Sequence, residues 1–114
     1  PMTNTTTYYD PAHLPRFGTV KEKAPELGRK FFHWYGAVFE EGALTAREKA
    51  LIALAVAHAV QCPYCIEAYT SDSLAKGADL DQMTEAVHVA AAIRGGASLV
   101  HAVQMREHAA KLGM

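Results

Sequence analysis

The sequence has little of what marks several common protein classes. Two of its 114 residues are cysteines, too few for the disulfide framework of a small secreted domain. Lysine and arginine number 11 against 12 acidic residues and form no basic tract, so we expect no nucleic-acid partner. No segment reaches the ~18 uninterrupted apolar residues of a membrane span. Residues 1–7 lack the apolar core of a signal peptide. We therefore expect a cytoplasmic protein with no membrane partner.

Strand patterns are nearly absent as well, whereas helical periodicity and helix punctuation run along the chain. We predict an all-α fold: one compact domain of about five to six helices over residues 10–114, after a flexible tail over residues 1–9. Half of the residues are hydrophobic, which is a large share for so short a chain. Part of that apolar surface is therefore expected to meet other subunits of a homo-oligomer.

Start and stop signals divide the chain into its predicted helices. Thr45-Ala46-Arg47-Glu48 has the form of a capping box, and Asp79 to Gln82 repeats the pattern. Asp10-Pro11 can open a first short helix, and Gly95-Gly96 is expected to break the chain between the last two helices. The longer helices are predicted over residues 25–41, 46–61, 63–76, 79–94 and 97–111.

The most informative motif is Cys62-Pro63-Tyr64-Cys65, which contains both cysteines of the chain. Proline suits the first position of a helix, where its missing N–H costs nothing. A helix that begins at Pro63 places both thiols at its N-terminus, where unpaired N–H groups and the helix dipole stabilise a thiolate. We interpret the pair as redox-active.

A Cys-x-x-Cys pair can also bind zinc, fill a core or belong to another redox fold. Zinc needs two more ligands, and His88, His101 and His108 do not form a recognised paired spacing, so no metal is expected. His88 and His101 are instead expected to be core or interface histidines. A purely structural pair of small buried side chains is a further alternative. Cys-Pro-Tyr-Cys is also the active-site tetrapeptide of glutaredoxins, but that fold places it after a β-strand, and here an apolar helix precedes it.

The surrounding residues resemble the alkylhydroperoxidase D-like, or carboxymuconolactone decarboxylase, family. The resemblance is carried by Leu44 to Ala57, by the cysteine motif, by Ala75-Lys76-Gly77-Ala78 and by the stretch from Glu85 to Gly96, and it covers roughly residues 25–112. The sequence of residues 31–41 resembles that of the arsenosugar-biosynthesis-associated peroxidase-like subgroup.

The resemblance implies a cofactor-free helical protein that assembles as trimers or hexamers. For the peroxidase branch it also implies that Cys65 attacks a hydroperoxide, that Cys62 resolves the resulting sulfenic acid as a disulfide, and that an external dithiol reduces the pair. The expected partners are therefore a small hydroperoxide or disulfide substrate and a dithiol reductant.

Two positions depart from that branch, which has a glutamate twelve residues before the first cysteine and a histidine four residues after the second. Ala50 and Tyr69 stand there in this chain. Alanine does not titrate, and tyrosine titrates near ~10, so neither is a base at neutral pH. The candidate substitutes are His58, one helical turn before Cys62 if that helix is unbroken, Tyr69 as a hydrogen-bond donor, and Glu48. The alternative for His58 is a core histidine bonded to a backbone carbonyl or a subunit, for Tyr69 a packed aromatic, and for Glu48 the capping box. Glu67 is expected to stabilise its helix.

We predict a thiol-dependent oxidoreductase with the candidate catalytic residues Cys62, Cys65, His58, Tyr69 and Glu48. Its expected activity is hydroperoxide reduction or disulfide exchange. The alternatives are a lactone enzyme like the other branch of the family, which need not use a cysteine pair, and a non-catalytic redox-sensing helical oligomer.

Overall fold

The computed structural model describes residues 7–114, which contain helices and no β-strand. The order along the chain is a 3-10 helix, η1 (Pro11–Lys23), followed by five α-helices: α1 (Pro25–Val38), α2 (Ala46–Ala59), α3 (Pro63–Ala75), α4 (Leu80–Leu99) and α5 (Ala102–Lys111). The predicted all-α fold is confirmed. Of the tail predicted over residues 1–9, residues 1–6 lie outside the described range, and the side chain of Tyr9 contacts that of Tyr64.

Local caps fix where the central helices begin. The Thr45 hydroxyl accepts a hydrogen bond from the Glu48 N–H (3.0 Å), and the Glu48 carboxylate accepts one from the Thr45 N–H (2.8 Å). Asp79 and Gln82 form the same reciprocal pair at the start of α4, at 2.8 and 3.0 Å. Both predicted capping boxes are confirmed, because each needs only residues three apart in sequence.

The predicted break at Gly95-Gly96 is wrong. Both glycines lie inside α4, and α5 begins at Ala102 instead of Ala97. An interior glycine weakens a helix by ~1 kcal/mol, but it ends one only where the chain adopts a left-handed conformation. Gly77 does so after α3, with φ 89°, whereas Gly95 and Gly96 keep negative φ angles. A second correction concerns α2, which ends at Ala59, two residues earlier than predicted.

The core lies where α2 packs against α3 and α4. Leu54, Ala78 and Met83 are buried at its centre, and Leu51 and Tyr69 pack around them. Only one side of α2 is buried, although its sequence is apolar almost all round. Its opposite side exposes a stripe at four-residue spacing, Ile52, Val56 and Val60.

The N-terminal elements form a second contact layer. η1 lies along α1 and also touches α3. Gly28 permits the approach, because a Cβ atom there would overlap the side chain of Lys21. Phe17 of η1 packs edge-on against the ring of Phe32, with centroids 4.9 Å apart. This contact holds η1 against α1.

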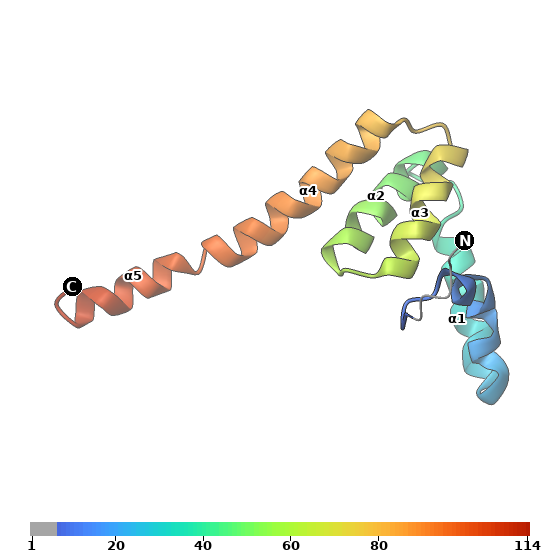
Figure 1. Ribbon diagram of the computed structural model, residues 1–114, viewed down its shortest axis with the longest axis horizontal. Coiled ribbons are helices and arrows are strands. Elements are labelled where there is room, and N and C mark those ends of the chain that lie inside the picture. Colours follow the sequence, from blue (N-terminus) through green and yellow to red (C-terminus); the bar gives the residue numbers. More distant parts are fainter. Residues whose placement is uncertain (1–6) are drawn as a thin grey trace.

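The C-terminal part of the chain leaves this body (Figure 1). The buried residues of α4, Met83 and Ala90, both precede Arg94, whose guanidinium donates to the Ala59 carbonyl at the end of α2. We call residues 95–114 the C-terminal arm. With it, the radius of gyration is 19.3 Å, against about 13 Å for a globular chain of 100 residues. The helical stretch Leu80–Lys111 is long and apolar enough, by length and composition alone, to cross a membrane.

Candidate functional site

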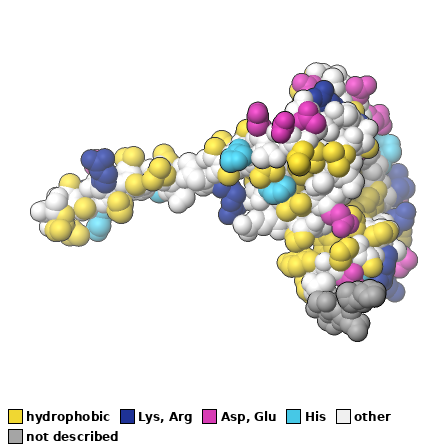
Figure 2. All heavy atoms as spheres, turned by 45° about the horizontal axis from the view of Figure 1, so that its top comes forward, with side chains coloured by type: hydrophobic (Ala, Val, Ile, Leu, Met, Phe, Trp, Pro, Cys, Tyr) yellow, Lys and Arg dark blue, Asp and Glu magenta, His cyan; other side chains and the backbone are white. Residues whose placement is uncertain are grey.

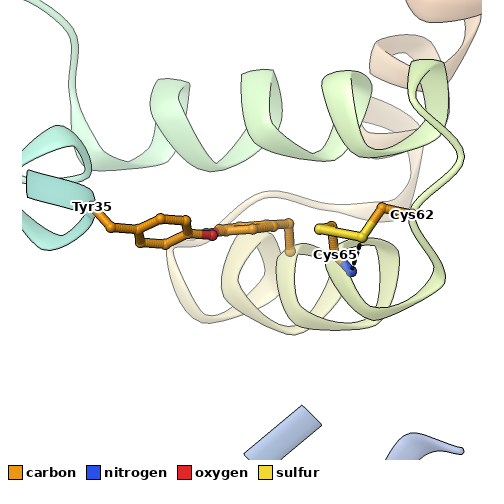
Figure 3. Close-up of a disulfide and its surroundings, with 4 residues drawn as sticks. Tyr35, Cys62 and Cys65 are labelled. Atoms are coloured by element: carbon orange, nitrogen blue, oxygen red, sulfur yellow. Dashed lines mark hydrogen bonds between the residues drawn. A yellow bond between two sulfur atoms is a disulfide. The ribbon is translucent and has the colours of Figure 1, made fainter. Parts of the chain in front are cut away.

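Cys62 and Cys65 form a disulfide at the N-terminus of α3 (Figure 3). Their Cα atoms are 5.2 Å apart, within the range of about 4.4–6.8 Å that a disulfide requires. Cys62 is the N-cap residue and Pro63 occupies the first turn, as the sequence predicts. The backbone therefore needs little movement to let the pair open and close.

The two sulfur atoms have different surroundings. The Cys65 N–H donates a hydrogen bond to Cys62 Sγ at 3.2 Å, so Cys62 occupies the place of a capping side chain. A negative charge on Cys62 Sγ is stabilised by this N–H and by the dipole of α3. Cys62 is thus the sulfur that leaves more readily when the disulfide is attacked at Cys65.

A cavity of about 630 Å³ lies between η1 and α3, and both cysteines form part of its wall. We call it the η1 cavity. Most of the remaining wall is apolar and comes from Leu14, Phe17 and Val20 of η1 and from Ala68 of α3. Its volume is typical of a small-molecule site, for which about 300–1,000 Å³ is usual.

A second cavity, of about 410 Å³, lies between α1, α2 and α3. We call it the α2 groove. It is lined by the exposed stripe of α2 and by Val38, Phe39 and Leu44, and among residues 7–114 Lys49 is the only charged one in its wall. Cys65 borders both cavities, whereas Cys62 borders only the η1 cavity. Cys65 is therefore the sulfur that can be approached from two sides.

The hydroxyl groups of Tyr35 and Tyr69 form a hydrogen bond with each other beside the cysteines. Both tyrosines also line both cavities. Tyr35 points from α1 along α3 towards the disulfide (Figure 3). Phe39 stacks on the Tyr69 ring, with centroids 5.1 Å apart. Burial, together with the hydrogen bond to Tyr35, raises the pKa of Tyr69. Tyr69 therefore stays protonated at neutral pH and acts as a hydrogen-bond donor, not as a base.

His58 is fixed by its own helix. Its Nδ1 lies 2.8 Å from the Leu54 carbonyl oxygen, which can only accept, so Nδ1 carries a proton and Nε2 holds the free lone pair of the neutral ring. The condition for a one-turn spacing from Cys62 is not met, because α2 ends at Ala59 and Gln61 turns the chain with φ 57°. His58 lines neither cavity.

Glu48 lies at the end of α2 remote from the cysteines and contributes to neither cavity wall. The backbone hydrogen bond from Thr45 lowers the pKa of Glu48, as expected for a capping carboxylate. Ala50, which occupies the place of the family glutamate, is fully buried. Glu67 is exposed on α3. The structure thus brings Tyr69 to the cysteines and leaves Glu48 away from them.

His88 and His101 are exposed, so neither is a core residue within one chain. The interface role remains the prediction for both. Within residues 7–114, no group of three or more histidine, cysteine or acidic side chains has the arrangement of a metal site.

Two residues of the site were not identified from the sequence. Tyr35 lies among aromatic residues whose sequence pattern indicates a packing role, and its hydrogen-bond partner Tyr69 is 34 positions away in the sequence. The hydroxyl is the one available signal, since a buried tyrosine O–H needs a partner that phenylalanine does not. Arg16, in the wall of the η1 cavity, comes from the segment after Asp10-Pro11, for which the sequence predicts only a short first helix and no role in a site.

Comparison with known proteins agrees with this architecture. Residues 25–107 match the profile of the Carboxymuconolactone decarboxylase family. A protein of Paracoccus denitrificans described as uncharacterized protein 4 in the cox locus is 51% identical over 85 residues, which cover 75% of this chain and 77% of that protein.

Two crystal structures are similar as well. One is of a Methanobacterium thermoautotrophicum protein, with a TM-score of 0.70, 37% identity, and coverage of 74% of this chain and 94% of that one. The other is an apo carboxymuconolactone decarboxylase family protein from Legionella pneumophila, with a TM-score of 0.66, 30% identity and coverage of 82% and 88%. The chain belongs to the carboxymuconolactone decarboxylase family.

Proposed function

We propose that this protein is a thiol oxidoreductase that reduces organic hydroperoxides through the Cys62–Cys65 pair. The observation that carries the proposal is the position of the disulfide: it lies at a helix N-terminus and in the wall of a cavity large enough for an organic molecule. The resemblance to the peroxidase branch of the family points the same way. The narrower resemblance of residues 31–41 to the arsenosugar-associated subgroup is part of this proposal and adds no separate chemistry.

The proposed cycle begins with the dithiol. The Cys65 thiolate attacks the terminal oxygen of the hydroperoxide, the O–O bond breaks, and the alkoxide leaves and takes up a proton as an alcohol. Cys62 then attacks the Cys65 sulfenic acid, which forms the disulfide and releases water. An external dithiol attacks Cys65 and expels Cys62, whose thiolate is stabilised by the Cys65 N–H. Two electrons pass from the dithiol to the peroxide in each cycle.

The tyrosine pair supplies hydrogen-bond donation in this scheme. One hydroxyl of the pair donates to the other, which leaves one O–H free to donate to the oxygen that departs as an alkoxide. This gives Tyr69 part of the role of the family histidine, with Tyr35 as its partner. His58 stays a proposed proton acceptor through Nε2, since its Nδ1–H donates to the Leu54 carbonyl. Because His58 lines neither cavity, the proton has to reach it through a water molecule.

The proposal is tested by hydroperoxide-dependent oxidation of a small dithiol. Cys65→Ser should lower turnover by at least about a hundredfold, because it removes the attacking sulfur. Cys62→Ser should still consume one equivalent of peroxide and stop at the sulfenic acid. Full activity of Cys65→Ser would contradict this mechanism. Lactone turnover that survives replacement of both cysteines would return the assignment to the lactone branch of the family.

We also propose that the protein works as a homo-oligomer, a trimer or hexamer, in the cytoplasm. Support comes from the C-terminal arm, in which nearly every residue is exposed although many are apolar (Figure 2). A helix without tertiary packing is marginally stable in water, so the arm needs a partner. The α2 groove has the matching apolar character, and a second copy seated there would close one approach to Cys65.

A further inference from the structure

The η1 cavity is much larger than the smallest peroxide requires. A water molecule, which is close in size to hydrogen peroxide, takes about 30 Å³ of liquid volume. The cavity has a volume of about 630 Å³, and most of the surface of its wall is apolar. Such a volume fits an organic molecule with a substantial hydrocarbon part, and burial of that part supplies binding free energy.

The polar groups of this wall carry charge of one sign only. Among the described residues, Arg16 is the only one in the wall that is charged at neutral pH, since no lysine, aspartate or glutamate lies there. The ion pairs within residues 7–114 are Arg29 with Glu26 and Lys76 with Asp72, so Arg16 has no acidic partner there. A guanidinium in a wall that holds no carboxylate of its own is suited to bind the carboxylate of a ligand.

We propose that the η1 cavity binds an organic hydroperoxide that also carries a carboxylate, with Arg16 binding the carboxylate and the apolar wall holding the hydrocarbon. The hydroperoxide group then reaches Cys65, which lines the same cavity as Arg16. This inference rests on the proposed function and names its substrate class. The redox step is unchanged: the hydroperoxide becomes the alcohol, the dithiol becomes the disulfide and water is released.

A matched pair of substrates tests the inference, namely cumene hydroperoxide and the same molecule with a para-carboxylate. The second-order rate constant for oxidation of the reduced protein is measured for each. The carboxylate should react about five- to tenfold faster, in line with one charge-assisted contact at a partly exposed site. Arg16→Gln should abolish the preference, so that the ratio of the two rate constants falls from about five- to tenfold to about one. High salt should weaken the preference in the unaltered protein.

Arg47→Gln is the matched control, because it removes the same charge from a position outside the cavity wall. Arg16→Lys keeps the charge and should retain part of the preference. Equal rates for the two substrates in the unaltered protein would overturn the inference, as would an Arg16→Gln variant that slows both equally. If neither substrate oxidises the dithiol, the proposed function itself fails, which is a different result from a loss of preference.

Discussion

Residues 46–90 and the C-terminal arm are both helical and rich in apolar side chains, yet they bury those side chains to opposite degrees. Leu54 in α2 is 1% exposed, whereas Leu99 at the end of α4 is 74% exposed. Within the first region α2 packs against α3 and α4, whereas the arm extends away from these helices (Figure 1). Apolar periodicity therefore specifies that a segment is helical, and it leaves open whether the surface it packs against belongs to the same chain.

The largest expected effect comes from charges placed on the arm. Val103→Asp combined with Met105→Asp should convert the oligomer to a monomer, because both side chains are exposed in the single chain and a charge inside an apolar interface is costly to desolvate. The measurement is molar mass by size-exclusion chromatography with light scattering.

Gln104→Asp, on the same helix, is the control and should keep the assembly. A monomeric unaltered protein would contradict the second-copy proposal. Flotation of that monomer with anionic phospholipid vesicles would assign the arm to a membrane instead, in keeping with the length and hydropathy of Leu80–Lys111.

A matched pair of leucine truncations sharpens the comparison next. Leu54→Ala should lower the free energy of unfolding by about 2–4 kcal/mol, since it leaves a cavity in a packed core. Leu99→Ala should cost less than about 0.5 kcal/mol in the monomeric arm variant. In the assembled protein it should cost more, by an amount that depends on protein concentration. Urea unfolding at two concentrations separates these cases, and equal costs at both positions in the monomer would refute the difference in burial.

The tyrosine pair predicts a pH dependence of the folding stability that comes from α1 and α3 and not from the C-terminal arm. Burial raises the pKa of Tyr69, so the folded state holds its proton more tightly than the unfolded chain does. The resulting stability is complete below the unfolded value of about 10 and is lost as the pH rises above it. The unaltered protein should lose up to about 1 kcal/mol per pH unit more than Tyr69→Phe above pH 10. Identical slopes in urea titrations of the two proteins would refute this.

The smallest expected effect is at Ser73, which is fully buried in α3 and whose hydroxyl has no hydrogen-bond partner among the described residues. Replacing an unsatisfied buried hydroxyl with a methyl group removes a desolvation penalty. Ser73→Ala should therefore raise the free energy of unfolding by about 0.5–1 kcal/mol. Thermal unfolding measures the change, and Ser71→Ala, at an exposed position of the same helix, should change little. A destabilised Ser73→Ala would mean that the hydroxyl has a partner in solution.

The sequence was sufficient wherever a feature depends on neighbouring residues. The caps at Thr45 and Asp79 and the start of α3 at Pro63 follow from side chains within three positions of one another. It was insufficient where the outcome depends on distant contacts. The pairing of Tyr35 with Tyr69 joins two helices, and the path of α4 through Gly95-Gly96 depends on a hydrogen-bond ladder that a glycine weakens without breaking.

The same distinction between neighbouring and distant residues applies to the candidate site. The sequence identified Cys62, Cys65 and Tyr69, which share one helix and its N-cap. The prediction for His58 assumed that α2 continues to Cys62, which would place the two residues one helical turn apart. The turn at Gln61 removes that spacing. Arg16 and the η1 cavity could not be foreseen, because η1 reaches the cysteines only through its packing on α1 and α3.

The most direct test of the central claim is a single-turnover reaction of the reduced protein with one equivalent of cumene hydroperoxide. Samples are quenched by rapid alkylation and weighed intact. The account predicts fast loss of two protons' mass through a transient single-oxygen adduct, and persistence of that adduct on Cys65 in the Cys62→Ser variant. Two thiols that remain fully alkylatable after many minutes would contradict the assignment as a hydroperoxide reductase.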